Sequence, residues 1–383
     1  MKIIQLIVDN REGARQYDNP TPWFGTAPQG LLEGFANLGR SKCEIHVVTC
    51  RQQPMAAPEK LADNIWIHSL HVPKIGWLRT GYQGCIRAVR KKITEIQPDI
   101  VHAQGTERDC AISAVFLPFP KVLTIHGNLQ LISKLLRPPL WSSLALQTQI
   151  EKFCIPRFNG VVCITRYTEE NIRDQNPRTW LLPNAATGSF FDVVNQPVEP
   201  MEILYIATVD ERKNQNAFID AITPLAAEFD FRVRFFGAGH AGSPFMDEFN
   251  RRMTAHSWCT YEGTVAHGDL RQNYARASIL VLASLEDNCP MTVLEAMASG
   301  VAVMGSRVGG IPDLIEHEVS GLLCDPTDAS SMRETLRRLL ANPMDRIRLA
   351  TAARERTLAG NHPTVIAAKH IDIYSEVLGL SGG

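Results

Sequence analysis

A continuous apolar run that leads through a polar loop into a short helical pattern constrains this chain more than any other feature. Residues 277–283 suit a strand of a buried parallel sheet. Residues 284–290 form the polar loop and end in Pro290, a residue favoured in the first turn of a helix. Residues 292–299 are mainly good helix formers, and Gly300 follows where helices often end. Ligands of open parallel sheets bind at such junctions, so the sequence predicts a binding site here.

Two acids flank this junction. Asp287 lies in the loop and Glu295 in the helical pattern, eight residues further on. Backbone N–H groups near residues 289–293 are suited to phosphate, and carboxylates are suited to sugar hydroxyls. Together they favour a sugar nucleotide as the ligand. On spacing alone the alternative, an ordinary solvated helix residue and an ordinary loop acid, stays open.

The order of segments around these acids resembles the donor-binding signature of a large glycosyltransferase family. Its motif is Glu, seven residues, Glu; Glu295 in L-E-A-M-A-S-G takes the second place, and Asp287 takes the first beside Glu286. The segments 301–304, 309–315 and 321–325 follow in the family's order. The chain resembles the retaining GT-B glycosyltransferases of the group 1 and family 4 type. The resemblance implies an α/β fold with two Rossmann-like domains whose parallel sheets face across a cleft.

The length of 383 residues favours two domains, each with its own core. By the resemblance, residues 1–188 form an acceptor-side Rossmann-like domain and residues 200–360 a nucleotide-sugar-binding one. Residues 361–383 are expected to form a C-terminal helix that packs back on the first domain.

Composition indicates an ordinary soluble protein, with 45% hydrophobic and 21% charged residues. The net charge of −1 gives no case for nucleic acid as a partner. Nine scattered cysteines without metal-like spacing indicate reduced thiols and a cytoplasmic protein with no metal site. The apolar start at residues 3–8 is too short for a signal peptide, and no run is long enough to span a bilayer.

Charge is unevenly distributed along the chain. Residues 1–190 hold 22 Lys and Arg against 15 Asp and Glu, while the remainder holds 17 against 25. A basic first half fits two domains that face each other, or a half that approaches an anionic surface. Unevenly charged solvated faces are the preferred interpretation. Trp77 and Trp141, each near Lys and Arg, are compatible with peripheral contact with the inner face of a membrane or a lipid acceptor. Ordinary buried aromatic residues on a solvated edge are the preferred interpretation.

In the first domain the resemblance points to Gly25 and His126. The family has a glycine-rich loop under the donor phosphates, and Phe24-Gly25 keeps one of its two usual glycines. Residues 121–127 resemble the family's L-T-x-H-G segment. This implies that His126 hydrogen-bonds the donor sugar and stabilises charge near the reacting carbon. For His102, at the end of the preceding predicted strand, a structural role is the preferred interpretation.

In the second domain the resemblance places a phosphate-binding cation at Lys213, where a fixed positive charge would stabilise the leaving diphosphate. The family's arginine position holds Thr208, which weakens the diphosphate clamp unless Arg212 reaches in, and both residues are donor-binding candidates. This departure leaves open a different donor geometry, a slow enzyme or an inactive one. Asp287 is expected to position the donor sugar, and Glu295 to accept hydrogen bonds from the ribose. The remaining donor-binding candidates are Gly237, Val265, Asn288, Cys289, Pro290, Met291 and Thr292.

The sequence therefore predicts a retaining glycosyltransferase that moves a sugar from a UDP-, GDP- or ADP-linked donor to a hydroxyl acceptor. The acceptor is a glycan, a lipid-linked molecule or a small molecule, as in polysaccharide biosynthesis. No cofactor and no essential metal are expected. Two alternatives stay open: an epimerase or phosphorylase on the same fold, and a non-catalytic binding protein, which the departures at Thr208 and Asp287 favour.

Overall fold

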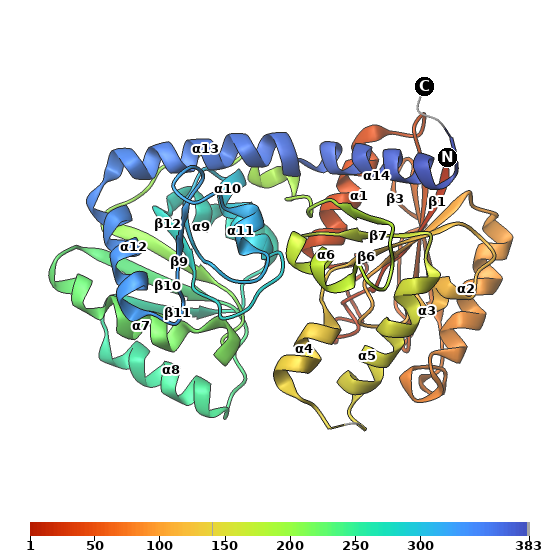
Figure 1. The fold of residues 1–383 in the computed structure, drawn as a ribbon, viewed down its shortest axis with the longest axis horizontal. Helices are drawn as coiled ribbons and strands as arrows, with labels where there is room; N and C mark the ends of the chain where they lie inside the picture. Colours follow the sequence, from red (N-terminus) through yellow and green to blue (C-terminus); the bar gives the residue numbers. More distant parts are fainter. Residues whose placement is uncertain (140, 381–383) are drawn as a thin grey trace. The chain divides into compact units, whose positions relative to one another are not determined.

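The computed structural model describes residues 1–139 and 141–380 and divides the chain into two compact units (Figure 1). The N-terminal unit consists of Met1–Ala185 together with the segment from His362 onward, and the C-terminal unit consists of Ala186–Asn361. Leu140, within the aromatic and basic segment 134–141, and positions 381–383 of the expected C-terminal segment lie outside the described residues.

The N-terminal unit is built on an eight-stranded sheet with the order β3-β4-β2-β1-β5-β6-β7-β8. Its strands are β1 (Lys2–Leu6), β2 (Glu44–Arg51), β3 (Lys60–Ala62), β4 (Ile65–His71), β5 (Ile100–Gln104), β6 (Lys121–Ile125), β7 (Gly160–Cys163) and β8 (Thr179–Leu181). All neighbouring strands are parallel except β3 and β4, which the short turn at Asp63 and Asn64 joins in antiparallel fashion. The expectation of a parallel sheet is confirmed for all of this unit except that edge.

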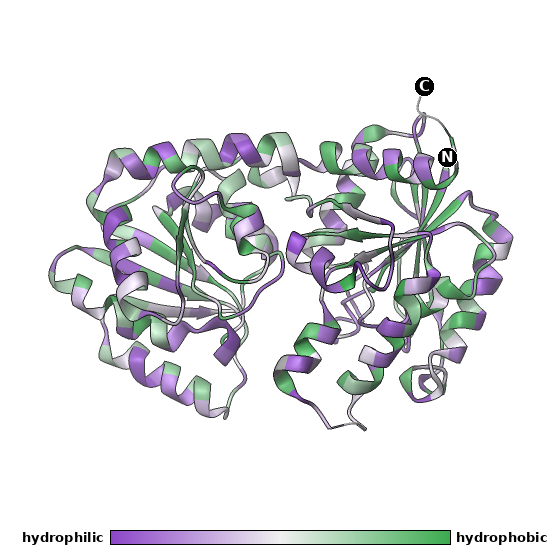
Figure 2. Ribbon diagram, viewed as in Figure 1, coloured by the Kyte–Doolittle hydropathy of each residue, from purple (hydrophilic) through white to green (hydrophobic). Residues whose placement is uncertain are grey.

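Helices cover both faces of this sheet, and each face has its own apolar core. The helices are α1 (Thr26–Leu38), α2 (Gln83–Ile96), α3 (Cys110–Val115), α4 (Leu129–Leu136), α5 (Ser143–Cys154), α6 (Arg166–Ile172) and α14 (Pro363–Val377). Helices α1 and α14 pack together on one face, and α2 and α3 cover the other. Figure 2 shows the strands mostly in the hydrophobic colour, whereas the helices mix both, as amphipathic elements do.

The sequence predicts a helix only from Leu31 to Leu38, because Pro28 and Gly30 are typical of a loop. Helix α1 already begins at Thr26, and both residues lie inside it. Proline is tolerated in a first helical turn because its missing N–H would have no intrahelical partner there. At Gly30 a Cβ atom would lie 2.7 Å from the carbonyl oxygen of Ala185, so close packing rather than a turn requires this glycine.

The C-terminal unit is built on a six-stranded parallel sheet with the order β11-β10-β9-β12-β13-β14. Its strands are β9 (Met201–Ile206), β10 (Phe231–Phe236), β11 (Cys259–Gly263), β12 (Ile279–Leu282), β13 (Ala302–Ser306) and β14 (Leu322–Cys324). Its helices are α7 (Gln215–Ile222), α8 (Pro244–Ala255), α9 (Leu270–Arg276), α10 (Met291–Ala298), α11 (Ile311–Leu314), α12 (Ala329–Ala341) and α13 (Pro343–Asn361). The sequence analysis missed α13, whose polar and apolar residues show little helical periodicity.

The two tryptophans of the proposed membrane surface differ sharply in exposure. Trp77 is buried and donates its indole N–H to the carbonyl oxygen of Val72 at 2.9 Å. It therefore belongs to the core, as the preferred interpretation of this residue holds, and not to a membrane surface. Trp141 is 90% exposed. Within the described part of the chain, no helix is both long and apolar enough to cross a membrane.

A buried polar network ties α14 to the sheet of the N-terminal unit. The hydroxyl of Tyr374 accepts a hydrogen bond from Gln5 at 2.9 Å and lies 2.6 Å from Nδ1 of His102. The other ring nitrogen of His102 lies 2.7 Å from the hydroxyl of Thr124. Since His102 is fully buried and both its nitrogens are engaged, it holds strands β1, β5 and β6 to α14.

His370, also on α14, makes the stability of this unit depend on pH. Burial lowers the pKa of His370 from 6.5 to about 4. Above pH 6.5 the side chain is neutral in both the folded and the unfolded chain, so it has no effect. Below that pH only the unfolded chain takes up the proton. We expect the free energy of unfolding to fall between pH 6.5 and pH 4, by about 3 kcal/mol from this residue.

Urea unfolding at several pH values tests this expectation. His370→Gln cannot titrate, so its unfolding free energy should depend less steeply on pH than that of the wild type. The exposed His240 provides the control, and His240→Gln should leave the dependence unchanged. Equal slopes for wild type and His370→Gln would contradict the assignment.

Candidate functional site

The strand order of the C-terminal sheet by itself locates a candidate ligand site. From β9 the chain proceeds outward to β10 and β11 on one side, and it later returns to β12 and proceeds to β13 and β14 on the other. Loops that leave the carboxyl ends of β9 and β12 therefore diverge. This switch point is where open α/β sheets bind ligands. Lys213 follows β9 and Asp287 follows β12, so both lie at this point.

The turn after β9 holds Lys213 in place through its backbone. Asp210 accepts a hydrogen bond from the N–H of Lys213 at 2.9 Å, and the hydroxyl of Thr208 donates to the same carboxylate at 2.9 Å. The buried hydroxyl of Tyr205 donates to the carbonyl oxygen of Lys213 and accepts from the N–H of Ala283 at 3.1 Å. This phenol thus connects the ends of β9 and β12.

The loop after β12 is fixed by the loop after β13. The carbonyl oxygen of Asp287 accepts a hydrogen bond from the N–H of Gly310 at 3.0 Å. Gly309 has a φ of +55°, and a Cβ atom there would lie 2.0 Å from that same oxygen. Only glycine allows this approach. One oxygen of the Asp287 carboxylate accepts from the N–H of Asn288 at 3.1 Å, which orients the side chain.

Lys213 and Asp287 meet as a buried ion pair. Both residues are less than a tenth exposed, and the ammonium group donates directly to the carboxylate. The sequence analysis treated them as separate groups, one for phosphate and one for sugar. Their contact means that each charge stabilises the other inside the protein. Arg212, the expected substitute cation, instead pairs with Glu286 at 3.4 Å in a more exposed position.

Glu295 is almost fully buried on α10, and both of its carboxylate oxygens have partners. One oxygen lies 2.8 Å from Nε2 of His267, and the other accepts from the hydroxyl of Tyr274 at 3.3 Å. The rings of both partners pack edge-on against Phe190. The carboxylate is therefore a fixed group, not a solvated helix residue. Each oxygen can accept more than one hydrogen bond, so the carboxylate retains acceptor capacity beyond these two contacts.

The remaining predicted residues lie along the same edge of the sheet. No side chain caps the start of α10 at Pro290, which leaves the first helical N–H groups, at Met291 and Thr292, oriented toward this edge. Cys289 is buried. Gly237 follows β10 and accepts from the hydroxyl of Tyr261 at 2.9 Å, while Val265 follows β11 and is partly exposed.

Gly25 and His126 belong to the N-terminal unit, at the carboxyl ends of β1 and β6. Gly25 has a φ of +83° and immediately precedes α1, which has no side-chain cap. The buried Arg11 bonds the carboxylate of Asp9 through two nitrogens and the carbonyl oxygens of Asn19 and Ala56. This arginine therefore shapes the loop that leads to Gly25.

His126 accompanies two other polar groups at the same edge. Its Nε2 atom lies 2.9 Å from the amide oxygen of Gln104, while Glu107 accepts from the N–H of Gly127 at 2.8 Å. Burial, and then the nearby His370, lower the pKa of His126 from 6.5 to about 4. The imidazole is therefore neutral at physiological pH. Burial also raises the pKa of Glu107.

Sequence reasoning missed several of these polar residues. His267 had a signal, because it follows the predicted strand near Val265 by two residues. Tyr205 and Tyr274 had no sequence signal, because a buried tyrosine in a strand or helix has the same sequence pattern as an ordinary core residue. Glu107 also had none, because its role depends on the neighbouring strand β6.

Two family models match the chain in succession. Residues 31–186 match Glycosyltransferase Family 4, and residues 200–342 match Glycosyl transferases group 1. The chain belongs to the glycosyltransferases of group 1 and family 4. These proteins are enzymes, and the expected family and GT-B fold are confirmed.

Individual relatives of this glycosyltransferase are distant in sequence and close in fold. The sulfoquinovosyl transferase SQD2 of Arabidopsis thaliana is 28% identical over 165 residues, which cover 42% of this chain and 31% of that protein. The sucrose-phosphate synthase of Thermosynechococcus elongatus has a TM-score of 0.80, with 18% identity and 100% of both chains covered. Anabaena Alr3699/HepE, solved with UDP-glucose, has a TM-score of 0.71 at 15% identity, covering 98% of this chain and 100% of that one.

The buried pair in this glycosyltransferase predicts a strong energetic coupling. Lys213→Met or Asp287→Asn leaves the other charge buried without its partner, so each should lower the free energy of unfolding by about 3 kcal/mol. The double variant should lose less unfolding free energy than the sum of the losses in the two single variants. A double-mutant cycle by urea unfolding measures this coupling. Arg212→Met with Glu286→Gln is the matched control, with a coupling of about 0–1 kcal/mol. A coupling at Lys213 and Asp287 no larger than that of the control would contradict the prediction.

Proposed function

We propose that this protein transfers a sugar from a nucleotide-sugar donor to a hydroxyl acceptor, with retention of configuration at the sugar carbon. The observation that carries the proposal is the set of groups at the switch point of the C-terminal sheet. A fixed carboxylate, a buried lysine–aspartate pair and an uncapped helix start occupy one edge. These groups match the ribose, the diphosphate and the sugar of one donor.

In this proposal, Glu295 accepts hydrogen bonds from the hydroxyl groups of the ribose. His267 and Tyr274 hold its carboxylate from the protein side, so ribose hydroxyls need not order a mobile side chain when they bind. The entropy cost of binding falls accordingly. The N–H groups at Met291 and Thr292 receive the diphosphate, together with the favourable end of the helix dipole. Gly237 and Val265 lie on the nucleoside side.

In this proposal, Lys213 binds the diphosphate and remains paired with Asp287. A cation already held in a buried site needs little rearrangement as negative charge grows on the leaving phosphate. The other oxygen of Asp287 accepts the N–H of Asn288 and retains acceptor capacity for a hydroxyl group of the donor sugar. Because these residues and the helix supply the positive field, the proposed reaction uses no essential metal. The neutral His126 of the N-terminal unit donates or accepts a hydrogen bond at the reacting sugar.

The proposed acceptor is a hydroxyl group of a glycan, a lipid-linked molecule or a small molecule, in a cytoplasmic protein. Peripheral contact with the inner face of a membrane is supported by Trp141 and Leu136, which are 90% and 63% exposed. The exposed cationic residues Lys134 and Arg137 lie beside them in sequence and suit anionic lipids.

Donor binding is the first test. UDP, GDP, ADP and their sugar conjugates are compared by the rise in Tm of the purified protein, with UDP-glucose as the first conjugate. A ligand at 100 times its Kd adds about 2.7 kcal/mol of stability. We expect one nucleotide to raise Tm. No rise with any of them would favour the non-catalytic alternative, for which the family's arginine position, occupied here by Thr208, is the specific reason.

Variants at Glu295 test its proposed role. Glu295→Ala removes a charged acceptor of ribose hydroxyls, so kcat/KM for the donor should fall about ten- to a hundredfold. Glu295→Gln keeps the size and one acceptor oxygen, and it should lose less. Tyr274→Phe is the control, because it removes a hydroxyl from the carboxylate without removing the carboxylate. Unchanged kcat/KM in Glu295→Ala, with its fold verified by circular dichroism, would refute the role.

The stereochemical course distinguishes the proposal from its rivals. With an α-linked nucleotide sugar and a suitable hydroxyl acceptor, NMR of the first product should show an α-linkage, since the reaction retains configuration. A β-linked product would overturn the retaining mechanism. Conversion of the donor without any acceptor would indicate an epimerase, and a requirement for inorganic phosphate would indicate a phosphorylase.

A further inference from the structure

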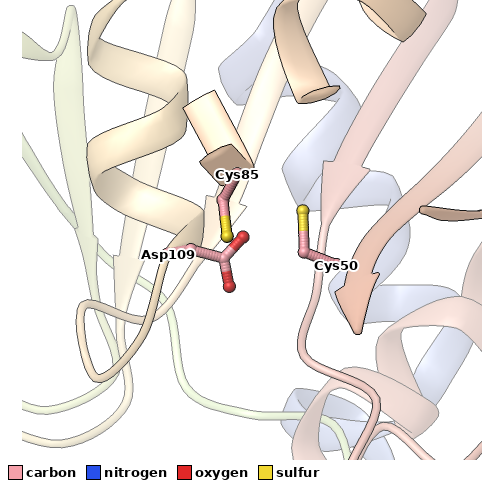
Figure 3. Close-up of side chains that lie close together, drawn as sticks. All are labelled: Cys50, Cys85 and Asp109. Carbon is pink, nitrogen blue, oxygen red and sulfur yellow. The ribbon is translucent and has the colours of Figure 1, made fainter. Parts of the chain in front are cut away.

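Three metal-ligating side chains converge inside the N-terminal unit, although they are far apart in the sequence. Cys50 lies near the carboxyl end of β2, Cys85 in the first turn of α2, and Asp109 immediately before α3. Their sulfur and carboxylate oxygen atoms all lie within 4.8 Å of one another. Figure 3 shows the three side chains close together, with Cys50 across from Cys85 and Asp109.

This cluster differs from an ordinary buried cysteine. Cys50 and Asp109 are each 5% exposed and Cys85 is fully buried, so all three are shielded from solvent. A single thiol packs well among apolar side chains, because it behaves as a small hydrophobic group. Here two thiols share a buried site with the carboxylate of Asp109, and the neighbouring cation Arg108 is shared with Glu12. Three side chains of types that bind metal ions therefore meet in one shielded place.

We propose that Cys50, Cys85 and Asp109 bind a thiophilic divalent cation of the Zn²⁺ type within the N-terminal unit. Two sulfur ligands favour Zn²⁺ over Mg²⁺ or Ca²⁺, which prefer oxygen ligands. Three protein ligands leave one position of a tetrahedral ion, which a solvent molecule fills. The cation is structural, and no step of the proposed sugar transfer depends on it.

The electrostatics of the cluster agree with this assignment. Binding Zn²⁺ converts two thiols to thiolates and releases two protons, so the bound cation faces two thiolates and a carboxylate. Arg108, next to Asp109 in the chain, lies near the cluster and also pairs with Glu12 at 3.1 Å. Because binding releases these protons, Zn²⁺ affinity should weaken as pH falls.

The position of the cluster indicates what the cation would stabilise. It would connect β2, α2 and the loop that follows β5. That loop also carries Glu107, which accepts the N–H of Gly127 beside His126. Cross-linking the loop to two other elements would hold this edge of the sheet in one conformation, much as a metal clip closes a long chain segment.

Metal binding by the whole chain tests the proposal. The protein, treated with a chelator and a phosphine reductant so that a Cys50–Cys85 disulfide cannot form, is titrated with Co²⁺ and then with Zn²⁺. We expect one Co²⁺ per chain, with thiolate-to-cobalt charge-transfer absorption that Zn²⁺ abolishes. A Zn²⁺ concentration of 100 times Kd should raise Tm by roughly 5 °C or more. Reduced, folded wild type that binds neither ion would overturn the proposal.

Single-residue variants locate the site. Cys50→Ala, Cys85→Ala and Asp109→Asn should each lose the absorption or weaken Co²⁺ affinity by about tenfold or more. Cys163→Ala, at a buried thiol on β7 outside the cluster, is the matched control and should keep both. Absorption that persists in both cluster cysteine variants would place the metal elsewhere and overturn the proposal. UDP binding, measured separately by Tm, reports on the C-terminal unit, so failure of the metal site and failure of the proposed function are distinguishable.

Discussion

The ion pair between Lys213 and Asp287 is the interaction on which the C-terminal site depends. It joins the loops after β9 and β12 at the point where the chain direction in the sheet diverges. Each charge alone would be costly to bury, whereas together they are tolerated at less than a tenth exposure. Tyr205 and Gly309 fix the backbone on either side, so the pair keeps one geometry. A cation at a site built in this way is available for phosphate without a large rearrangement.

The buried charge of Glu295 is likewise stabilised by groups of the protein itself. His267 and Tyr274 come from different elements and engage its two oxygens, and Phe190 packs against both rings. The carboxylate is therefore already oriented before a ligand binds. In the N-terminal unit, two histidines perform a different task. Low pKa values keep His126 and His370 neutral, so His126 can pair with Gln104, and His370 with the carbonyl oxygen of Ile366, without adding a charge.

Periodicity and composition predicted much of the fold. The apolar run at residues 277–283, Pro290 and Gly300 predicted β12, the loop and α10, because strand burial and helix ends act over a few neighbouring residues. Errors occurred where distant contacts override local preference. Pro28 and Gly30 lie within α1, because Gly30 packs against Ala185, and α13 forms on packing that its own periodicity does not show.

The sequence by itself determined the family, the GT-B fold and the residue types available at each loop, since these follow from local order along the chain. Only the tertiary structure decided which of those residues meet. Lys213 contacts Asp287, His267 reaches Glu295, and Cys50, Cys85 and Asp109 converge, although 35 residues separate Cys50 from Cys85. The physical reason is that parallel strands bring their carboxyl ends to one edge in the order of the sheet, not in the order of the chain.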